Sequence, residues 1–494
     1  MSKKKYGRGE LLNRRQFLQR TTAFGFSFKT VPPLLWSLLH HEVARAEQIN
    51  PVPFLSIHAA GGGGFYQYFV ARDNNGQPLS GRLFPSHGVP SNQLSVSNGI
   101  VTEFGTPLWN KAADGVNTIS GFTEGLLRVM SPEAISRTTI VAIPNVSGND
   151  NTAGAEYGTS EAMAMLLTRL GVQLKVAHLV GLSNTPSGNG TAGIAQYPGL
   201  AKIIPQSLTD LTGVGTFSKT FAARGATESQ MTLFADHINR YLTAKIGSPS
   251  TGGTDDKFKN IQTAAAADLM EKASPRSGMT PNDLNPARNA AAVQALGITN
   301  PNNFGNSGGD IMKALIFNVV SGIYPIGAFN MGGFDYHGGN FSSTLARDAA
   351  LGDVMGRACE LAVRLNKPLL QFCSTDGGLR ATGITGPQDP NATNSYWAGD
   401  DSNYCMAFLV FTRPSTNSHT ILKTQLGATA SDTGRTDSST LVGTARLATA
   451  AAIANWCALS GISLSQIDPV LLGAGIPQAA IDKIKSEGIC FAPA

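Results

Sequence analysis

The chain has 494 residues, of which 42% are hydrophobic and 14% are charged. A typical soluble domain carries about 25% charged residues, so this chain is poor in charge. Its hydrophobic fraction excludes a chain that is disordered throughout, because such chains combine few apolar residues with a high net charge. The length is sufficient for one large domain or for two ordinary ones.

The formal charge of +5 is concentrated near the N-terminus. Residues 1–46 hold nine of the 38 Lys and Arg residues and two of the 33 Asp and Glu residues, which leaves a formal charge of −2 on the rest. Surfaces that bind nucleic acid or anionic membranes need clustered positive charge. The composition after residue 46 therefore argues against nucleic acid as a partner.

The first 46 residues have the pattern of a bacterial export signal. Arg14 and Arg15 are followed by Phe17 and Leu18, which is typical of the twin-arginine signal. This pattern predicts two transient partners, the twin-arginine translocase and a signal peptidase. The other interpretation is an ordinary amphipathic N-terminal helix.

The segment after the two arginines fits export better than a membrane anchor. Residues 21–39 are only moderately apolar and contain Lys29 and two prolines, so they are a poor transmembrane span. Ala44 and Ala46 are the small residues that a signal peptidase reads. We expect cleavage after Ala46 and a periplasmic or secreted mature chain without an integral membrane span.

Strands and helices alternate along the mature chain. Apolar and β-branched runs predict strands at residues 54–59, 138–143, 176–182, 326–330, 368–373 and 405–411. Helical spacing of apolar residues predicts helices at residues 121–130, 160–170, 310–323, 343–365 and 439–459. This order predicts an α/β fold with a parallel sheet and helices on both faces.

One segment interrupts the alternation. Residues 183–305 are rich in small and polar residues at their start and then show helical spacing at 228–246 and 257–273. We interpret this segment as a helical, loop-rich insertion in a single domain that spans residues 47–494.

The five cysteines do not form a recognisable site. None is spaced as C-x-x-C, which argues against a thiol-ligated zinc and against a redox pair. Cys359, Cys373 and Cys405 lie in apolar runs, and we expect them to be buried in the core.

Four glycines, Gly61 to Gly64, follow the first predicted strand. Such a run allows a tight turn and close approach of the backbone to a ligand. It is not G-x-G-x-x-G, and no clear helix follows it, so a nicotinamide or flavin cofactor is poorly supported.

Polar residues follow several of the predicted strands, where open α/β sheets bind ligands. Asp335 and His337 follow one strand, Asp376 follows the next, and Asp400 precedes the last. Carboxylate and imidazole groups together suit a divalent cation such as zinc, manganese or calcium. Arg380 has the planar fork that suits a phosphate or sulfate group.

Each of these residues has an alternative structural role. Asp335 is placed to cap the following helix, and a lone histidine such as His337 is often a satisfied structural group. Asp376 precedes two glycines and is a common turn residue, and Asp400 with Asp401 fits a solvated loop.

The leader and the segment Gly333-Phe334-Asp335-x-His337 together resemble an exported bacterial family, domain-of-unknown-function family 1501. That family is grouped with the alkaline-phosphatase and sulfatase superfamily. The late segment Asp432-Thr433-Gly434-Arg435 is similar to the family's Asp-x-Gly-Arg motif. The resemblance covers most of the mature chain and implies an alkaline-phosphatase-like core.

The resemblance also implies a chemistry. Superfamily enzymes hold two metal ions with Asp and His side chains, and a hydroxyl or modified Cys attacks a phosphate or sulfate ester. Carried over to this sequence, the metal ligands are Asp335, His337, Asp376 and Asp400. Arg380 then holds the anion, and Thr159 or Ser160 is the nucleophile.

The sequence departs from the family pattern at three places. Phe65 and Tyr66 stand where the family has an acidic residue, and no histidine follows Ser160 or Asp400. A two-metal site needs more ligands than the sequence supplies. Two hypotheses remain: a metal-dependent hydrolase of phosphate or sulfate esters, and a non-catalytic periplasmic or envelope binding protein with an eroded metal site.

Overall fold

A computed structural model describes most of the chain after residue 48. The described residues are 49–69, 71–77, 120–147, 158–170, 172, 179–181, 202–203, 211, 284–305, 307–336, 341–375, 377–382, 396–415 and 418–493. The chain divides into Met1–Gln48 and Ile49–Ala494, and all described residues belong to the second unit. The expected signal residues, the expected cleavage residues and the helices expected at 228–246 and 257–273 lie outside the described residues.

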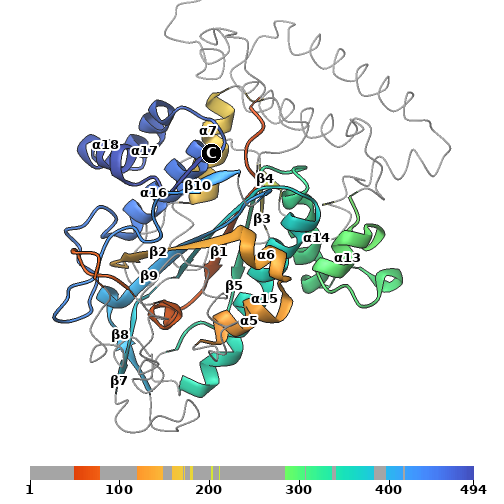
Figure 1. The fold of residues 1–494 in the computed structure, drawn as a ribbon, viewed down its shortest axis with the longest axis horizontal. Helices are drawn as coiled ribbons and strands as arrows, with labels where there is room; N and C mark the ends of the chain where they lie inside the picture. Colours follow the sequence, from red (N-terminus) through yellow and green to blue (C-terminus); the bar gives the residue numbers. More distant parts are fainter. Residues whose placement is uncertain are drawn as a thin grey trace, which may run out of the picture. The chain divides into compact units, whose positions relative to one another are not determined.

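A seven-stranded sheet forms the centre of the second unit (Figure 1), in the order β2-β9-β6-β1-β5-β3-β4. Six strands point the same way, and β9 runs antiparallel to both of its neighbours. The strands are β1 (Phe54–Ala59), β2 (Thr138–Asn145), β3 (Leu179–Gly181), β4 (Lys202–Ile203), β5 (Ile326–Met331), β6 (Leu369–Thr375) and β9 (Cys405–Thr412).

The α/β class is confirmed, but the sheet is mixed rather than parallel. Between β6 and β9 the chain forms an antiparallel hairpin of β7 (Leu379–Thr382) and β8 (Tyr396–Asp400). A parallel connection would need a crossover, usually a helix, to return the chain to the other edge of the sheet. Because the hairpin returns it to the same edge, β9 starts where β6 ends and runs back.

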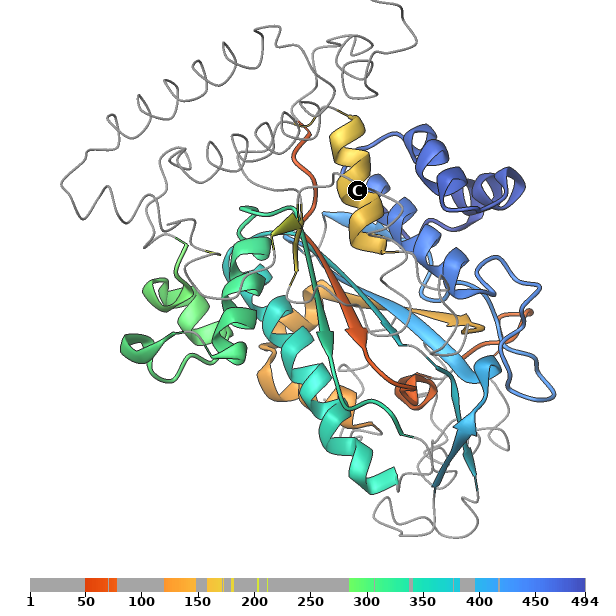
Figure 2. The same ribbon diagram turned by 180° about the vertical axis from the view of Figure 1, so that it is seen from behind.

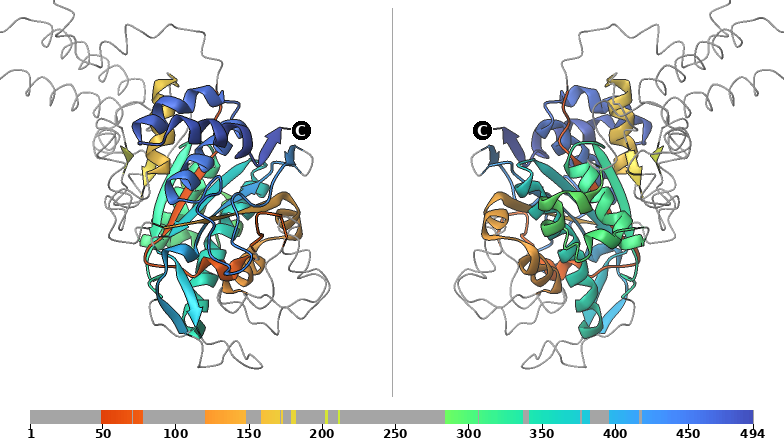
Figure 3. Two further views of the ribbon diagram at one scale, coloured as in Figure 1. Left: turned by 90° about the vertical axis from the view of Figure 1, so that its left-hand side faces the viewer. Right: turned by 90° about the vertical axis from the view of Figure 1, so that its right-hand side faces the viewer.

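Helices cover both faces of the sheet (Figures 2 and 3). Side chains of one face form a core cluster with helices α5, α6, α13, α14 and α15, and those of the other form a second cluster with α7, α16, α17 and α18. The helices are α5 (Gly121–Val129), α6 (Pro132–Arg137), α7 (Thr159–Arg169), α13 (Ala290–Ala295), α14 (Gly308–Val320), α15 (Phe341–Arg364), α16 (Ala445–Leu459), α17 (Asp468–Gly473) and α18 (Gln478–Glu487).

Side-chain caps define several helix starts. Ser120, Ser131 and Ser307 each accept a hydrogen bond from a backbone N–H in the first turn of the helix that follows. The last core helix was expected from residue 439 but begins at Ala445, because residues 437–443 form turns and Thr444 is the cap.

Shorter elements complete the described chain. The 3-10 helices are η2 (Phe65–Tyr68), η4 (Pro286–Arg288), η5 (Pro301–Asn303), η6 (Ser402–Tyr404) and η7 (Leu464–Ile467), and β10 (His419–Ile421) pairs with β11 (Phe491–Pro493). Residues at the end of the expected insertion, among them Ala292 and Leu296, are buried in the α14/α15 core. Among the described residues, no helix is long and apolar enough to cross a membrane.

The outer strand β2 is fully buried although it pairs with only one strand. The segment 424–426 covers its free side: Ala142 N–H donates to Thr424 O at 3.1 Å, and Leu426 N–H donates to Ala142 O at 2.9 Å. Val146 is bonded in the same way to residues 443 and 445. The outward-facing main-chain groups of Ala142 and Val146 are therefore satisfied by the chain itself.

Cys359, Cys373 and Cys405 are buried as expected, and Cys457 and Cys490 are buried as well. All five are free thiols with buried side chains. Burial raises the pKa of Cys359 to about 11 and that of Cys490 to about 12. These thiols therefore stay protonated at neutral pH and are poor nucleophiles.

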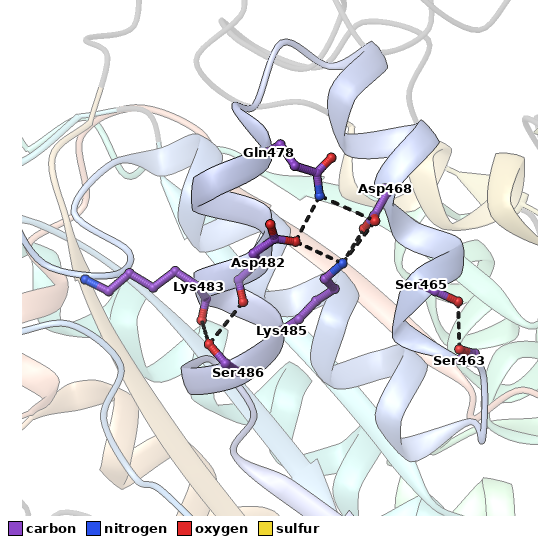
Figure 4. Close-up of polar contacts among 8 residues, drawn as sticks. All are labelled: Ser463, Ser465, Asp468, Gln478, Asp482, Lys483, Lys485 and Ser486. Atoms are coloured by element: carbon purple, nitrogen blue, oxygen red, sulfur yellow. Dashed lines mark hydrogen bonds and ion pairs between the residues drawn. The ribbon is translucent and has the colours of Figure 1, made fainter.

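The last two helices are joined by a polar cluster (Figure 4). Lys485 Nζ of α18 lies 2.9 Å and 3.0 Å from the two carboxylate oxygens of Asp468 at the start of α17. It also lies 3.2 Å from Asp482 Oδ1, and Gln478 Nε2 donates to Asp482 Oδ1 at 2.9 Å. The carboxylate of Asp468 is near the N-terminus of α17, where a negative charge is favourable.

Helices α5 and α15 pack with their backbones in close contact. A Cβ on Gly125 would collide with Ala349 O, and a Cβ on Gly352 would collide with Phe122 O. Glycines at these positions allow the two helices to approach more closely than larger residues would. The interface carries Phe122, Leu126 and Leu351 into the core under β1 and β6.

We predict that Gly352→Ala lowers the free energy of unfolding by about 1–3 kcal/mol or more, because the added methyl collides with the main-chain oxygen of Phe122. The measurement is urea unfolding of the mature protein. Gly309→Ala is the matched control: Gly309 also lies in a helix, and a methyl added there would meet no neighbouring atom within 4 Å. Equal unfolding midpoints for the two variants would contradict the close packing of α5 on α15.

Candidate functional site

The carboxyl ends of β1, β5 and β6 lie side by side and form the candidate site. In register, His58 of β1 is opposite Asn330 of β5 on one side and Ser374 of β6 on the other. His58 Nδ1 lies 3.1 Å from Ser374 Oγ. The pair is a contact between an imidazole and a hydroxyl, the two groups that commonly act together in proton transfer.

His58 and Ser374 face the layer of helices α7 and α16. Side chains alternate along a strand, and their neighbours Ile57 and Cys373 belong to the core on the opposite face. His58 is only 9% exposed. Ser374 also lines a small cavity with Asn145, Thr375, Cys405 and Thr449, of about 10 Å³, which is room for about one water molecule.

The glycine run after β1 forms a closed turn. The Thr375 hydroxyl lies 2.9 Å from Ala59 O and 2.7 Å from Gly61 O, and it accepts a hydrogen bond from Gly63 N–H at 2.9 Å. Gly61 has φ +100°, and a Cβ there would meet the backbone of Asp335. The close approach at Gly61 is therefore to the chain's own backbone, and the expected approach to a ligand stays a prediction.

Three strand ends meet at this turn. The segment that carries Asp335 is joined to it by hydrogen bonds from Ala60 N–H to Met331 O at 2.9 Å and from Phe334 N–H to Ala60 O at 3.1 Å. On the other side, Gly62 lies against Leu379, at the start of β7. The segment that carries Asp335 therefore lies at the glycine turn, and the side chain of Asp335 is exposed.

Helix α7 brings the two candidate nucleophiles to the same layer. Thr159 and Ser160 are its first residues, and both are buried, at 5% and 2% exposure. Because β2 and β3 point the same way, α7 returns the chain from the carboxyl edge, so its N-terminus lies toward that edge. Ser160 Oγ has no hydrogen-bond partner among the described residues.

The other predicted site residues lie farther along the chain. Arg380 is exposed on β7, at an irregularity in the pairing with β8, and the backbone of Asp400 pairs with Leu379. Asp401 caps η6 by accepting from Asn403 N–H at 3.2 Å, and Arg435 lies 3.6 Å from it. Asp401 and Arg435 therefore have structural partners.

The described donors do not by themselves make a metal site. Within the described part of the chain, no group of three or more His, Cys, Asp or Glu side chains is placed to hold a metal ion. His337 and Asp376 lie outside that part, as does the side chain of Asp400. Asp335 is the one predicted ligand whose side chain is described, and a single carboxylate does not fit the two-metal arrangement.

A buried carboxylate supports the segment that carries Asp335. Asp348 of α15 is fully buried and accepts hydrogen bonds from Gln67 Nε2 at 2.7 Å, from Tyr336 Oη at 2.9 Å and from Tyr68 Oη. Burial raises the pKa of Asp348 to about 7, and the three donors offset part of this increase. Tyr336 directly follows Asp335, so the cluster holds that segment against α15 and η2.

Three residues of the site region were not predicted as functional: His58, Ser374 and Asp348. For His58, a signal was available in the sequence, because one imidazole stands in an otherwise apolar strand directly before four glycines. The partner of His58 could not be identified, since Ser374 lies 316 positions away and the contact depends on the β1–β6 register.

Comparisons of the chain with protein-family models, with curated proteins and with solved structures find no match. The interpretation of the site therefore depends on its geometry.

We predict that stability falls as pH rises from about 4 to about 7, in part because of Asp348. Between these values the folded protein keeps the Asp348 proton while the unfolded chain has lost it, so deprotonation favours unfolding by at most roughly 4 kcal/mol. Asp348→Asn should remove this contribution, because an amide oxygen still accepts from both tyrosines. The measurement is the urea midpoint across this pH range.

The matched control is Asp437→Asn, an exposed carboxylate bonded to Ser439 and Asn74 whose pKa is lowered by these contacts. Because its pKa is lowered in the folded protein, Asp437 makes the protein more stable as pH rises, and this change lies below about pH 4. An unchanged slope between pH 4 and 7 in Asp348→Asn would contradict the assignment.

Proposed function

We propose that the chain is an exported hydrolase of phosphate or sulfate esters, with its reaction centre at the carboxyl edge of β1, β5 and β6. The observation that carries the proposal is Ser160: a hydroxyl at 2% residue exposure, in the first turn of an 11-residue helix, without a hydrogen-bond partner among the described residues. A buried hydroxyl in that state is costly unless it serves a ligand or a reaction.

The position of Ser160 suits an anionic substrate. The N-terminus of a helix presents free N–H groups and the positive end of the helix dipole. Gly158 precedes Thr159 and provides no capping side chain, but the buried carboxylate of Glu161 in the same first turn lies against Gly158. A bound anion would have to displace this carboxylate. A phosphate or sulfate group bound there accepts hydrogen bonds from the first-turn N–H groups, next to the hydroxyl that attacks it.

The contact between His58 and Ser374 supplies a proton-transfer group on the same layer. Hydrolysis adds one water to the ester and releases the alcohol and the inorganic anion, so protons must move to the leaving oxygen and from water. An imidazole exchanges protons near neutral pH. In this proposal Ser374 orients the His58 imidazole through the 3.1 Å contact with Nδ1.

The exposed carboxylate of Asp335 remains the proposed metal ligand among the described side chains, together with His337, Asp376 and Asp400 from the resemblance. Among the described residues, no set of three or more His, Cys, Asp or Glu side chains could hold a metal ion. The metal content of the exported protein is measured directly by elemental analysis, in wild type and in Asp335→Ala.

A second function is favoured by the closed turn at Gly61. The turn is filled by the chain's own backbone, and the cavity beside Ser374 has room for about one water molecule. A non-catalytic envelope protein that binds a partner through its loops has the same features. In that case Ser160 and His58 are structural, and export through the twin-arginine pathway is shared by both proposals.

We predict that the mature protein hydrolyses 4-nitrophenyl phosphate or 4-nitrophenyl sulfate. Ser160→Ala should lower kcat/KM by at least about 100-fold, and His58→Asn should lower it by a similar factor. The matched controls are Ser465→Ala and His419→Asn, which change the same residue types at η7 and at β10. Both controls should keep wild-type activity.

The outcomes separate the two functions. Turnover that is lost in Ser160→Ala and kept in Ser465→Ala supports the hydrolase. Wild-type protein with no turnover of either ester and no stoichiometric metal contradicts the hydrolase and leaves the binding function. Activity that survives Ser160→Ala shows that the nucleophile is elsewhere.

A further inference from the structure

A second concave site lies on the opposite helical layer, away from the carboxyl edge. It is a cleft of about 290 Å³ between helices α5, α14 and α15 and the turn after α13. This volume is just below the range of about 300–1,000 Å³ that is typical of ligand pockets. The cleft is therefore large enough for a small molecule and too small for a folded partner segment.

The floor of the cleft is apolar. Leu296, Met312, Ile316 and Val354 line it. Leu296 and Ile316 are almost completely buried at 1% and 2% exposure, whereas Met312 and Val354 are partly exposed. When a hydrocarbon group covers such a concave apolar surface, apolar area is removed from water, and this favours binding.

The rim of the cleft has an excess of positive charge. Arg128, Lys313, Arg357 and Asp353 are its charged residues, so three cations face one carboxylate. Asp353 is shared by the two arginines, at 3.0 Å from Arg128 and in direct contact with Arg357. The third cation is Lys313. Its ammonium donates to the backbone carbonyl of Gly297 at 3.3 Å and has no carboxylate partner among the described residues.

The arginine side of the rim is fixed by the fold. Arg357 also donates to Ala295 O at 3.4 Å, and Gly297, at φ +59°, is the residue against which its guanidinium packs. A side chain at position 297 would displace Arg357, so the turn after α13 is shaped around this cation. The stripe Ala350, Asp353, Val354 and Arg357 lies on one face of α15, at the spacing of successive helical turns.

We propose that this cleft binds a small amphipathic carboxylate, with its alkyl chain on the apolar floor and its carboxylate at Lys313. The size of the cleft limits the ligand to a free molecule of medium chain length. The apolar floor selects the hydrocarbon, and the ammonium without a carboxylate partner selects the negative charge. The site shares no residue with the carboxyl edge, so the proposal is independent of ester hydrolysis.

The test is calorimetric titration of the mature protein with decanoate, below the concentration at which decanoate forms micelles. We expect saturable binding of one decanoate per chain, weaker binding of decanol, and no binding of acetate. Lys313→Met keeps the apolar stem and removes the charge, and it should weaken decanoate binding about tenfold. The matched control is Lys483→Met, at an exposed lysine of α18. This variant should bind decanoate as the wild type does.

A second variant tests the floor. Val354→Asp places a carboxylate beside Asp353 and should abolish decanoate binding, with circular dichroism as the check that the helices are retained. Three results would overturn the proposal: equal affinity for decanol and decanoate, unchanged affinity in Lys313→Met, or absence of decanoate binding. Binding to vesicles of anionic phospholipid without binding of decanoate would also overturn it, because it would identify a membrane surface as the ligand.

Discussion

The parallel pairing of β1 with both β5 and β6 is the constraint on which the rest of the structure depends. Because β1 is bonded on both sides, its carboxyl end cannot move without breaking two ladders. The same register sets His58 beside Ser374 and aligns the ends of three strands at the glycine turn. Side chains of β1 alternate between the two faces of the sheet, with Leu55 and Ile57 on one face and Phe54 on the other. Helices cover both faces.

The two helical layers have different roles around this sheet. In the layer of α5, α14 and α15, glycines bring α5 close to α15, and Asp348 of α15 accepts hydrogen bonds from Tyr336 and Tyr68. The segment after β5 is therefore held against α15 through the hydrogen bond from Tyr336 to Asp348. The layer of α7 and α16 faces His58 and Ser374 and carries the buried hydroxyl of Ser160. One layer thus supports the segment after β5, and the other carries Ser160, the nucleophile of the proposed hydrolase.

The sequence predicted the α/β class, every strand of the central sheet except β4, and the burial of Cys359, Cys373 and Cys405, because these follow from local runs of apolar residues. It predicted most of the longer helices and missed the short ones, such as α6 and α17. It did not predict the direction of β9, since direction depends on the hairpin of β7 and β8 rather than on β9 itself. From motif order it proposed Ser160 as a nucleophile and Asp335 as a metal ligand, and both remain predictions. It missed the pairing of His58 with Ser374 and the cluster at Asp348, because each joins residues far apart in the chain. Such contacts depend on register and helix packing, which local patterns do not contain.

The covered edge of β2 has a consequence for association. An exposed edge strand is a template on which another chain can add a strand. Here the main-chain groups of Ala142 and Val146 are already bonded to residues 424–426 and 443–445 of the same molecule. A second copy would have to displace these segments before it could extend the sheet at β2. Association at that edge by strand addition is therefore disfavoured, and the chain is protected there against sheet-to-sheet aggregation.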